Sequence, residues 1–163
     1  MTNRRNMLAG MLGTVWLAAG ASSAKAADDC TEKTKLSALL DRYVAALNAH
    51  DARSYPDMFT ETYIQHSGRS PSGLAAQIEN LAHIVATWPD IQMQVEERIF
   101  DGNKIAARSL YTATHTQTVQ GFAPTGKRIS FTTLDIWRVE NGKLAEHWDL
   151  VDTAALQKQL RGE

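Results

Sequence analysis

Apolar residues recur at helical spacing in two stretches of the first half of the chain. Residues 32–49 place leucine, tyrosine and valine side chains three and four positions apart, and residues 72–88 repeat that spacing. This spacing gathers apolar side chains on one face of a helix. The sequence therefore predicts an amphipathic helix over residues 32–49, a short helix over residues 52–58, and another over residues 72–88 that Pro89 ends.

Beyond Pro89 the hydrophobic period changes from 3.6 residues to 2, which is typical of strands. The sequences "DGNK" and "ENGK" are turns between neighbouring strands. A short strand is also expected in "ETYIQH", and residues 153–160 are expected to form a terminal helix or tail. The predicted strands cover residues 61–66, 91–100, 105–118, 128–139 and 144–151.

Helices followed by a run of strands are typical of an α+β domain, with helices packed on one face of a curved antiparallel sheet. The chain has 163 residues, 44% of them hydrophobic, so a sizeable core is expected. A single domain over residues 31–163 accounts for this pattern. The net charge is -1, and Lys and Arg are scattered singly, which argues against a nucleic-acid partner.

The first 26 residues differ in character from the rest. Arg4 and Arg5 precede an apolar stretch from Met7 to Ala21, and small residues alternate up to Ala26. This is the pattern of a cleavable signal peptide, and the adjacent arginines resemble a twin-arginine export signal. The apolar stretch is shorter than the roughly 18–20 residues needed to span a bilayer. We therefore expect cleavage after Ala26 and a periplasmic or secreted protein without a membrane anchor.

The candidate chemistry is concentrated in "EHWDLVD" near the end of the chain. In a strand His147 and Asp149 are same-face neighbours roughly 7 Å apart, close enough to act on one bound molecule. Burial under helices would favour acid and base roles for both groups, whereas a charged solvent face or an ion pair at a sheet edge is the alternative. Alternation places Ala145 and Val151 with them, and Leu144, Glu146, Trp148 and Leu150 on the opposite face.

Two further histidines could join the same pocket if the sheet curls toward the helices. His66 ends the strand "YIQH", next to a loop rich in glycine and serine. His115 lies in "YTATHTQT", with Tyr111 on its own face of the strand. A structural histidine is the alternative for each.

Three more residues are candidates for the pocket wall. Asp135 lies between Leu134 and Ile136 in an apolar strand and shares a face with Trp137. It would either face the cavity or pair with an arginine, because a buried carboxylate needs a partner. Tyr43, on the first predicted helix, would offer a phenol to the cavity or be an ordinary core tyrosine.

Several chemistries lack their sequence motifs. The chain has no HExxH, paired CxxC, Walker A, strand-associated GxGxxG or GxSxG sequence, so zinc, nucleotide and dinucleotide chemistry lack support. Three separated histidines with Asp149 could bind a metal, but no pair of them has the spacing of a helical or tight-loop site, so no metal is predicted. Cys30 is the only cysteine, which excludes a disulfide within the chain.

Three segments, "YIQH", "PTGK" and "RVENGKLAEHWDLVD", together resemble the SnoaL-like polyketide cyclase group of the nuclear-transport-factor-2-like superfamily, also called ester cyclases. The resemblance covers residues 35–160. It implies a cone-shaped α+β barrel, in which a highly curved antiparallel sheet wraps around the N-terminal helices and leaves one deep pocket. It also implies homodimers packed through the outer sheet faces, which would suit the apolar residues Trp148, Leu150, Leu134 and Ile136.

The resemblance implies a cofactor-independent lyase or isomerase that acts on a small hydrophobic carbonyl compound. In the family an acidic residue near the end of the sheet is the acid and base of an intramolecular aldol closure. Motif matching gives that role to Asp149, with His147 and His66 as pocket partners. The substrate contacts expected beside them are His115, Tyr43, Asp135, Tyr111 and Trp137.

The predicted export signal leaves a second function open. Polyketide cyclases act on intracellular intermediates, so an exported relative is also compatible with a non-catalytic periplasmic binding or accessory module. Such a module would use the same cavity for a small molecule without turning it over.

Overall fold

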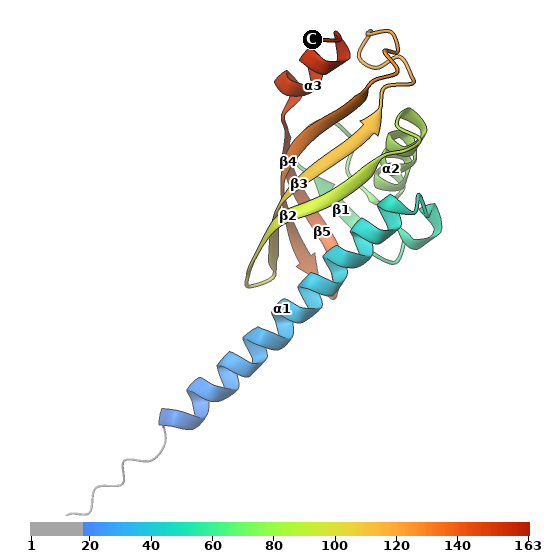
Figure 1. Ribbon diagram of the computed structural model, residues 1–163. Helices are drawn as coiled ribbons and strands as arrows, with labels where there is room; N and C mark the ends of the chain where they lie inside the picture. Colours follow the sequence, from blue (N-terminus) through green and yellow to red (C-terminus); the bar gives the residue numbers. More distant parts are fainter. Residues whose placement is uncertain (1–17) are drawn as a thin grey trace, which may run out of the picture.

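A five-stranded sheet in the order β1-β5-β4-β3-β2 forms the body of the protein. The computed structural model describes residues 18–163, and Figure 1 shows their arrangement. Strands β2 to β5 pair antiparallel, whereas β1 pairs in parallel with β5. The elements are α1 (Ala18–Asn48), η1 (Ala52–Ser54), β1 (Phe59–Gln65), α2 (Leu74–Thr87), β2 (Gln92–Asp101), β3 (Lys104–Thr114), β4 (Arg128–Glu140), β5 (Lys143–Val151) and α3 (Thr153–Leu160).

The α+β class with a curved sheet, predicted from the hydrophobic pattern, is confirmed. The sheet is mixed and open, however, because β1 joins its edge in parallel next to the last strand. The short helix predicted over residues 52–58 is a single 3-10 turn at Ala52–Ser54. The Asp51 side chain accepts a hydrogen bond from the backbone N–H of Arg53 and begins this turn, and Pro56 cannot extend it as a regular helix.

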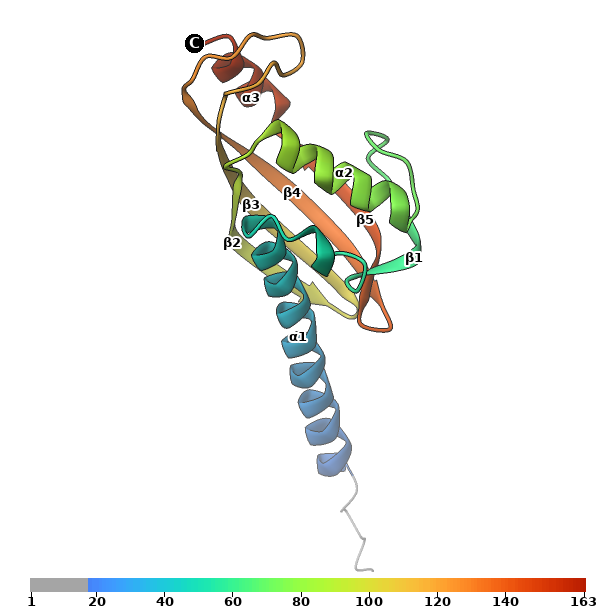
Figure 2. The same ribbon diagram turned by 90° about the vertical axis from the view of Figure 1, so that its right-hand side faces the viewer.

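The helices α1 and α2 lie on the same concave face of the sheet, as Figure 2 shows. The inward stripe of α1 is fully buried, with Leu36, Leu40 and Leu47 each 1% exposed. These leucines form one core cluster with residues of the sheet. The helical periodicity therefore identified the buried face of α1 correctly.

The terminal helix α3 packs on β4 and builds a second core cluster. Leu156 and Leu160 pack there with Trp88 and Ile91, at the far end of α2. The Asp152 carboxylate caps α3 by accepting a hydrogen bond from the backbone N–H of Ala155 at 3.0 Å. The two clusters lie at opposite ends of the concave face, and the cavity lies between them.

One predicted side-chain position on β5 is wrong. The β4–β5 ladder pairs Val139 with Leu144 and Arg138 with Glu146, so Ala145 is an extra residue in a β-bulge. The bulge turns Leu144 inward, where it is 1% exposed in the core cluster, although simple alternation placed it on the outer face. Beyond the bulge the predicted alternation holds for the rest of the strand.

No helix of residues 18–163 covers the convex face of the sheet (Figure 1). This face carries a continuous row of apolar side chains. Strand pairing aligns Ile99, Ala106, Ile136 and Trp148 across β2, β3, β4 and β5. Leu150 lies in the next row and is 71% exposed. Exposed apolar side chains in register are typical of a protein contact surface.

The predicted signal peptide falls largely outside the residues that the structure describes. Only residues 18–26 of it are placed, within the first turns of α1. No helix of residues 18–163 is both long and apolar enough to cross a membrane.

Candidate active site

A cavity of about 490 Å³ lies between α2 and the concave face of the sheet. Leu81 and Ile84 of α2, with Trp88 directly after it, supply one apolar wall, and Tyr111 and Phe131 supply the other from the sheet. The rings of Tyr111 and Phe131 are stacked, 5.2 Å apart and 3° from parallel. An apolar cavity with a few polar groups is the usual form of a small-molecule site.

Two of the residues predicted from the last strand converge in this cavity. His147 and Asp149 both line it, because successive inward positions of β5 point to the same face. The Asp149 side chain is only 6% exposed and forms an ion pair with Arg69 through Oδ2. Its other oxygen, Oδ1, is buried and has no hydrogen-bond partner among residues 18–163. The carboxylate is thus fixed through one oxygen while the other lacks a donor.

Arg69 reaches Asp149 from the loop between β1 and α2. This loop turns at Gly68, where φ is +69°, and at Gly73, where φ is +106°. Such positive φ values favour glycine, because a side chain there would be strained. The loop is held to β1 by a backbone hydrogen bond of 2.6 Å from Gly73 N to Tyr63 O. These turns place the arginine in the lining of the cavity.

Asp135 lies beside Asp149 as a second buried carboxylate in the cavity wall. It is 5% exposed, and its Oδ1 is 3.0 Å from Nε2 of His147. Its Oδ2 accepts a hydrogen bond of 2.5 Å from the Thr133 hydroxyl. The carboxylate therefore has a partner for each oxygen, as a buried charge requires. Of the two outcomes considered for Asp135, the structure shows the cavity position, and the partner is a histidine.

The hydrogen bonds of Gln65 define the tautomer of His147. The side-chain Oε1 of Gln65 accepts a hydrogen bond from the backbone N–H of Ser67 at 3.2 Å. Its Nε2 amide must then donate to Nδ1 of His147, 3.1 Å away, which leaves the imidazole proton on Nε2 to donate to Asp135. The ring also stacks on Trp137 at 4.7 Å. Both ring nitrogens are occupied, so His147 is held rigidly.

The tyrosines Tyr43 and Tyr111 line the cavity as predicted. Burial raises the pKa of Tyr43, and the negative charge of Asp135 raises it further. Burial likewise raises the pKa of Tyr111 well above its usual range, with added effects of Tyr43 and Asp135. Both phenols therefore stay protonated and remain hydrogen-bond donors at neutral pH.

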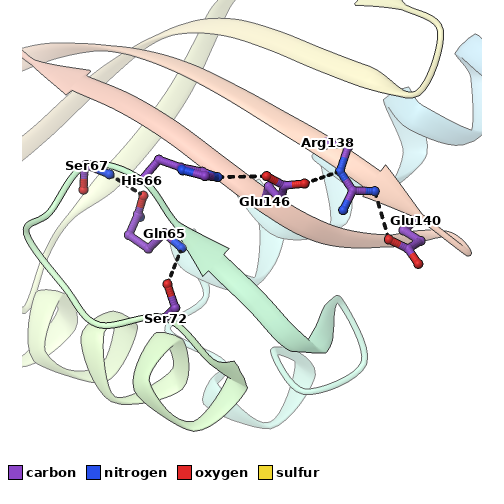
Figure 3. Close-up of polar contacts among 7 residues, drawn as sticks. All are labelled: Gln65, His66, Ser67, Ser72, Arg138, Glu140 and Glu146. Carbon is purple, nitrogen blue, oxygen red and sulfur yellow. Dashed lines mark hydrogen bonds and ion pairs between the residues drawn. The ribbon is translucent and has the colours of Figure 1, made fainter.

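The structure places His66 on the opposite side of the sheet from the cavity, which corrects its expected role as a pocket partner. Its Nε2 is 2.8 Å from Oε2 of Glu146, and Figure 3 shows the contacts continuing to Arg138 and Glu140. The ring stacks on Trp148 at 4.3 Å. Hydrogen bonds from His66 and Arg138 lower the pKa of Glu146. Side chains alternate along β1, so Gln65 faces inward and His66 outward.

Two other predicted substrate contacts do not line the cavity. His115 is fully buried beyond its end, near Trp88, with Nδ1 3.2 Å from the Thr125 hydroxyl. The strand β3 ends at Thr114, so His115 belongs to the following loop and packs into the core. Trp137 is 2% exposed and lies behind His147, on which it stacks. It supports the site without reaching the cavity.

Sequence reasoning missed several polar residues of the cavity, among them Gln65, Arg69 and Gln77. Alternation in "YIQH" would have identified Gln65, because it separates Tyr63 and Gln65 from their neighbours. Gln77 interrupts the apolar stripe of α2 at an inward position, which was also a usable signal. The position of Arg69 depends on the conformation of a loop and has no periodic signature. No cluster of metal-ligating side chains occurs within residues 18–163.

The family model for SnoaL-like polyketide cyclases matches residues 37–160 of the chain. That match covers most of the sequence, so the chain belongs to the SnoaL-like polyketide cyclase family, as the three sequence segments predicted. Family membership supports a cyclase- or isomerase-type function. No curated protein sequence matches the chain.

Solved structures of bacterial proteins share the fold. The chain is similar to TsrD from Streptomyces laurentii, with a TM-score of 0.72 and 24% identity over 78% of this chain and 95% of that one. It is also similar to AclR, a proposed hydroxylase from Streptomyces galilaeus, with a TM-score of 0.70 and 27% identity over 78% and 96% of the two chains. A SnoaL-like polyketide cyclase from Agrobacterium tumefaciens gives a TM-score of 0.65 and 25% identity over 75% and 97%.

Proposed function

We propose that this protein is a cofactor-independent lyase or isomerase that acts on a small hydrophobic carbonyl compound, with Asp149 as its acid and base. The observation that carries the proposal is the state of Asp149 in the cavity. One of its oxygens is fixed by Arg69, and the other is buried without a partner among residues 18–163. A preorganised, desolvated carboxylate oxygen is suited to accept a proton from a bound molecule.

In the proposed reaction Oδ1 of Asp149 removes a proton from the carbon next to the substrate carbonyl. The electron pair of that C–H bond moves to the carbonyl oxygen and forms an enolate. Arg69 has N–H groups beyond the one that binds Asp149, and Tyr43 has a protonated phenol. Both are donors that would stabilise the enolate oxygen.

Two outcomes follow from the enolate. In isomerisation Asp149 returns the proton to a different position of the same molecule. In ring closure the enolate carbon attacks a second carbonyl group, a carbon–carbon bond forms, and Asp149 protonates the resulting alkoxide. Neither route needs an oxidant, a reductant or a bound cofactor.

His147 has a positioning role in this proposal and transfers no proton. Both of its ring nitrogens are engaged, one with Gln65 and the other with Asp135. Asp135 lies directly opposite Asp149 on the neighbouring strand. If Asp135 had no partner, its negative charge would repel that of Asp149. The bonds from His147 and Thr133 satisfy Asp135, so among residues 18–163 Asp149 is the only carboxylate of the cavity with an unpartnered oxygen.

We propose further that the protein is an exported homodimer. The first 26 residues support export, because they have the charge and apolar pattern of a signal peptide. The dimer is supported by exposed apolar side chains on the convex face, where Ile99 is 61% and Leu134 54% exposed. Two sheets packed through these faces would leave both cavities open.

The function is tested by incubating the protein in deuterated buffer with 4-phenylbutan-2-one, an apolar ketone with exchangeable protons next to its carbonyl. An enzyme of the proposed kind accelerates deuterium incorporation over the rate in buffer, as followed by NMR. A binding module would give ligand-induced shifts in the protein spectrum with no acceleration, and that result would refute the proposal.

A further inference from the structure

Gln77 is a buried polar residue that neither the fold nor the proposed proton transfer requires. It lies on α2, lines the cavity and is 3% exposed. Its Oε1 is buried and has no hydrogen-bond partner among residues 18–163. A buried carbonyl oxygen without a donor destabilises a fold, so most such oxygens in proteins find a partner.

The surroundings of Gln77 make an apolar residue the expected occupant of this position. Leu74, Ile78 and Leu81 lie three, one and four positions away and form the inward stripe of α2. A leucine or methionine there would continue the stripe and remove the cost of the amide. The amide therefore serves a purpose other than packing.

Unpartnered buried atoms elsewhere in the chain do not share this setting. The hydroxyls of Tyr55, Tyr63 and Ser109 are also buried without a partner among residues 18–163, but these residues do not line the cavity. Within the cavity, as far as the described part of the chain forms it, the only side chains with such an atom are Gln77 and Asp149. One belongs to the helical wall and the other to the sheet wall, as the positions of α2 and β5 in Figure 2 indicate.

We infer that Gln77 is a specificity-determining residue whose amide oxygen accepts a hydrogen bond from a hydroxyl group of the substrate. If the carbonyl end of the molecule lies at Asp149, the hydroxyl lies toward the helical wall. The substrate class is then a hydroxylated carbonyl compound with an apolar body. The inference rests on the proposed function for the placement of the carbonyl group. It adds the hydroxyl as a second polar group of the substrate that the cavity recognises.

The test compares two ligands that differ by one hydroxyl: 4-hydroxy-4-phenylbutan-2-one and 4-phenylbutan-2-one. Equilibrium binding is measured by NMR titration for the wild type, Gln77→Met and the control Glu79→Met. Methionine keeps the length and helix propensity of glutamine but has no amide. Glu79 lies on the same helix, is exposed and does not line the cavity.

We expect the wild type and Glu79→Met to bind the hydroxylated ketone about tenfold more tightly than 4-phenylbutan-2-one. Gln77→Met should bind the two ketones alike. Because the substitution removes an unpartnered buried oxygen, it should also raise the melting temperature by about 2–4 °C. A merely structural glutamine would give a lower melting temperature instead.

The inference is overturned if Gln77→Met keeps the preference for the hydroxylated ketone. It is equally overturned if the wild type shows no preference, whether it binds both ketones or neither. The proposed function is judged separately by deuterium exchange. A protein that prefers the hydroxylated ketone without accelerating exchange would retain the role of Gln77 and lose the proposed chemistry.

Discussion

Asp135 and Asp149 are direct partners across the β4–β5 ladder, with both side chains buried in the wall of one cavity. Like charges directly opposite each other destabilise a sheet. Each carboxylate is therefore held by its own partner: Arg69 binds Asp149, and His147 with Thr133 binds Asp135. This division of partners leaves a single unpartnered oxygen on the pair, at Oδ1 of Asp149.

Replacing Arg69 should lower the free energy of unfolding, because the two neighbouring carboxylates then lose one of their partners. Arg69→Met leaves Asp149 without its cation beside a second carboxylate, so we expect a loss of about 1–2 kcal/mol in the free energy of unfolding. Arg69→Lys keeps the charge and should lose less. Urea denaturation measures both variants, and equal losses would show that packing of the side chain matters more than its charge.

The His147–Asp135 pair should behave as a coupled unit. His147→Leu removes the imidazole and leaves Asp135 with Thr133 alone, which should cost about 3–5 kcal/mol. Adding Asp135→Leu removes the stranded carboxylate, so the double variant should be more stable than His147→Leu alone. A double-mutant cycle by urea denaturation measures the coupling. Additive losses from the two substitutions would contradict it.

The buried phenols predict a loss of stability in alkali. The pKa values of Tyr43 and Tyr111 are raised in the folded protein, so the unfolded chain ionises first as pH rises past the usual tyrosine value of 10.0. The unfolded state then binds fewer protons than the folded state, and stability falls above about pH 10. Tyr43→Phe removes one of these phenols and should flatten that fall in urea midpoints measured between about pH 9 and pH 11.

Burial also raises the pKa values of Tyr55 and Tyr63, so Tyr43→Phe should remove only part of the fall in stability. If Tyr43→Phe loses stability with pH as steeply as the wild type, the burial of this phenol is not responsible.

If the protein is the proposed dimer, a charge on the convex face of the sheet should disrupt it. Leu150 is 71% exposed and lies next to Leu134 in the strand pairing. Leu150→Lys should convert the proposed dimer into a monomer, as measured by light scattering on a chain that begins at Ala27, the first residue expected after signal cleavage. Glu79→Lys serves as the control, since Glu79 is exposed on α2, which lies on the opposite, concave face of the sheet. A wild-type protein that is already monomeric would end the dimer proposal.

Much of the fold was readable from the hydrophobic pattern, because periods of 3.6 and 2 residues directly reflect burial of one face. The pattern fails where local geometry breaks the period. At Ala145 a single inserted residue reverses the facing of Leu144, and no composition signal marks the bulge. The parallel pairing of β1 with β5 joins the first strand of the chain to the last. Turn sequences indicate pairing only between strands that follow each other in the chain, so they could not predict it.

The sequence predicted part of the candidate site, as it predicted part of the fold. Alternation in the last strand brought His147 and Asp149 to one face, and both line the cavity. His66 was assigned by motif matching, although the alternation of β1, continued one residue past its end, turns His66 away from the cavity. Arg69 could not be found in the same way, because its position follows from backbone angles at Gly68 and Gly73. Periodicity predicts faces of regular elements and is silent on loops.

The central claim, that Asp149 is the base, is tested most directly by the rate of deuterium exchange into 4-phenylbutan-2-one with Asp149→Asn. The substitution keeps the size of the side chain and removes its basic oxygen. The control is Asp152→Asn, which can still cap α3 and does not line the cavity. We predict that Asp149→Asn binds the ketone within about threefold of the wild type but exchanges its protons no faster than buffer. Exchange at the wild-type rate by Asp149→Asn would contradict the account.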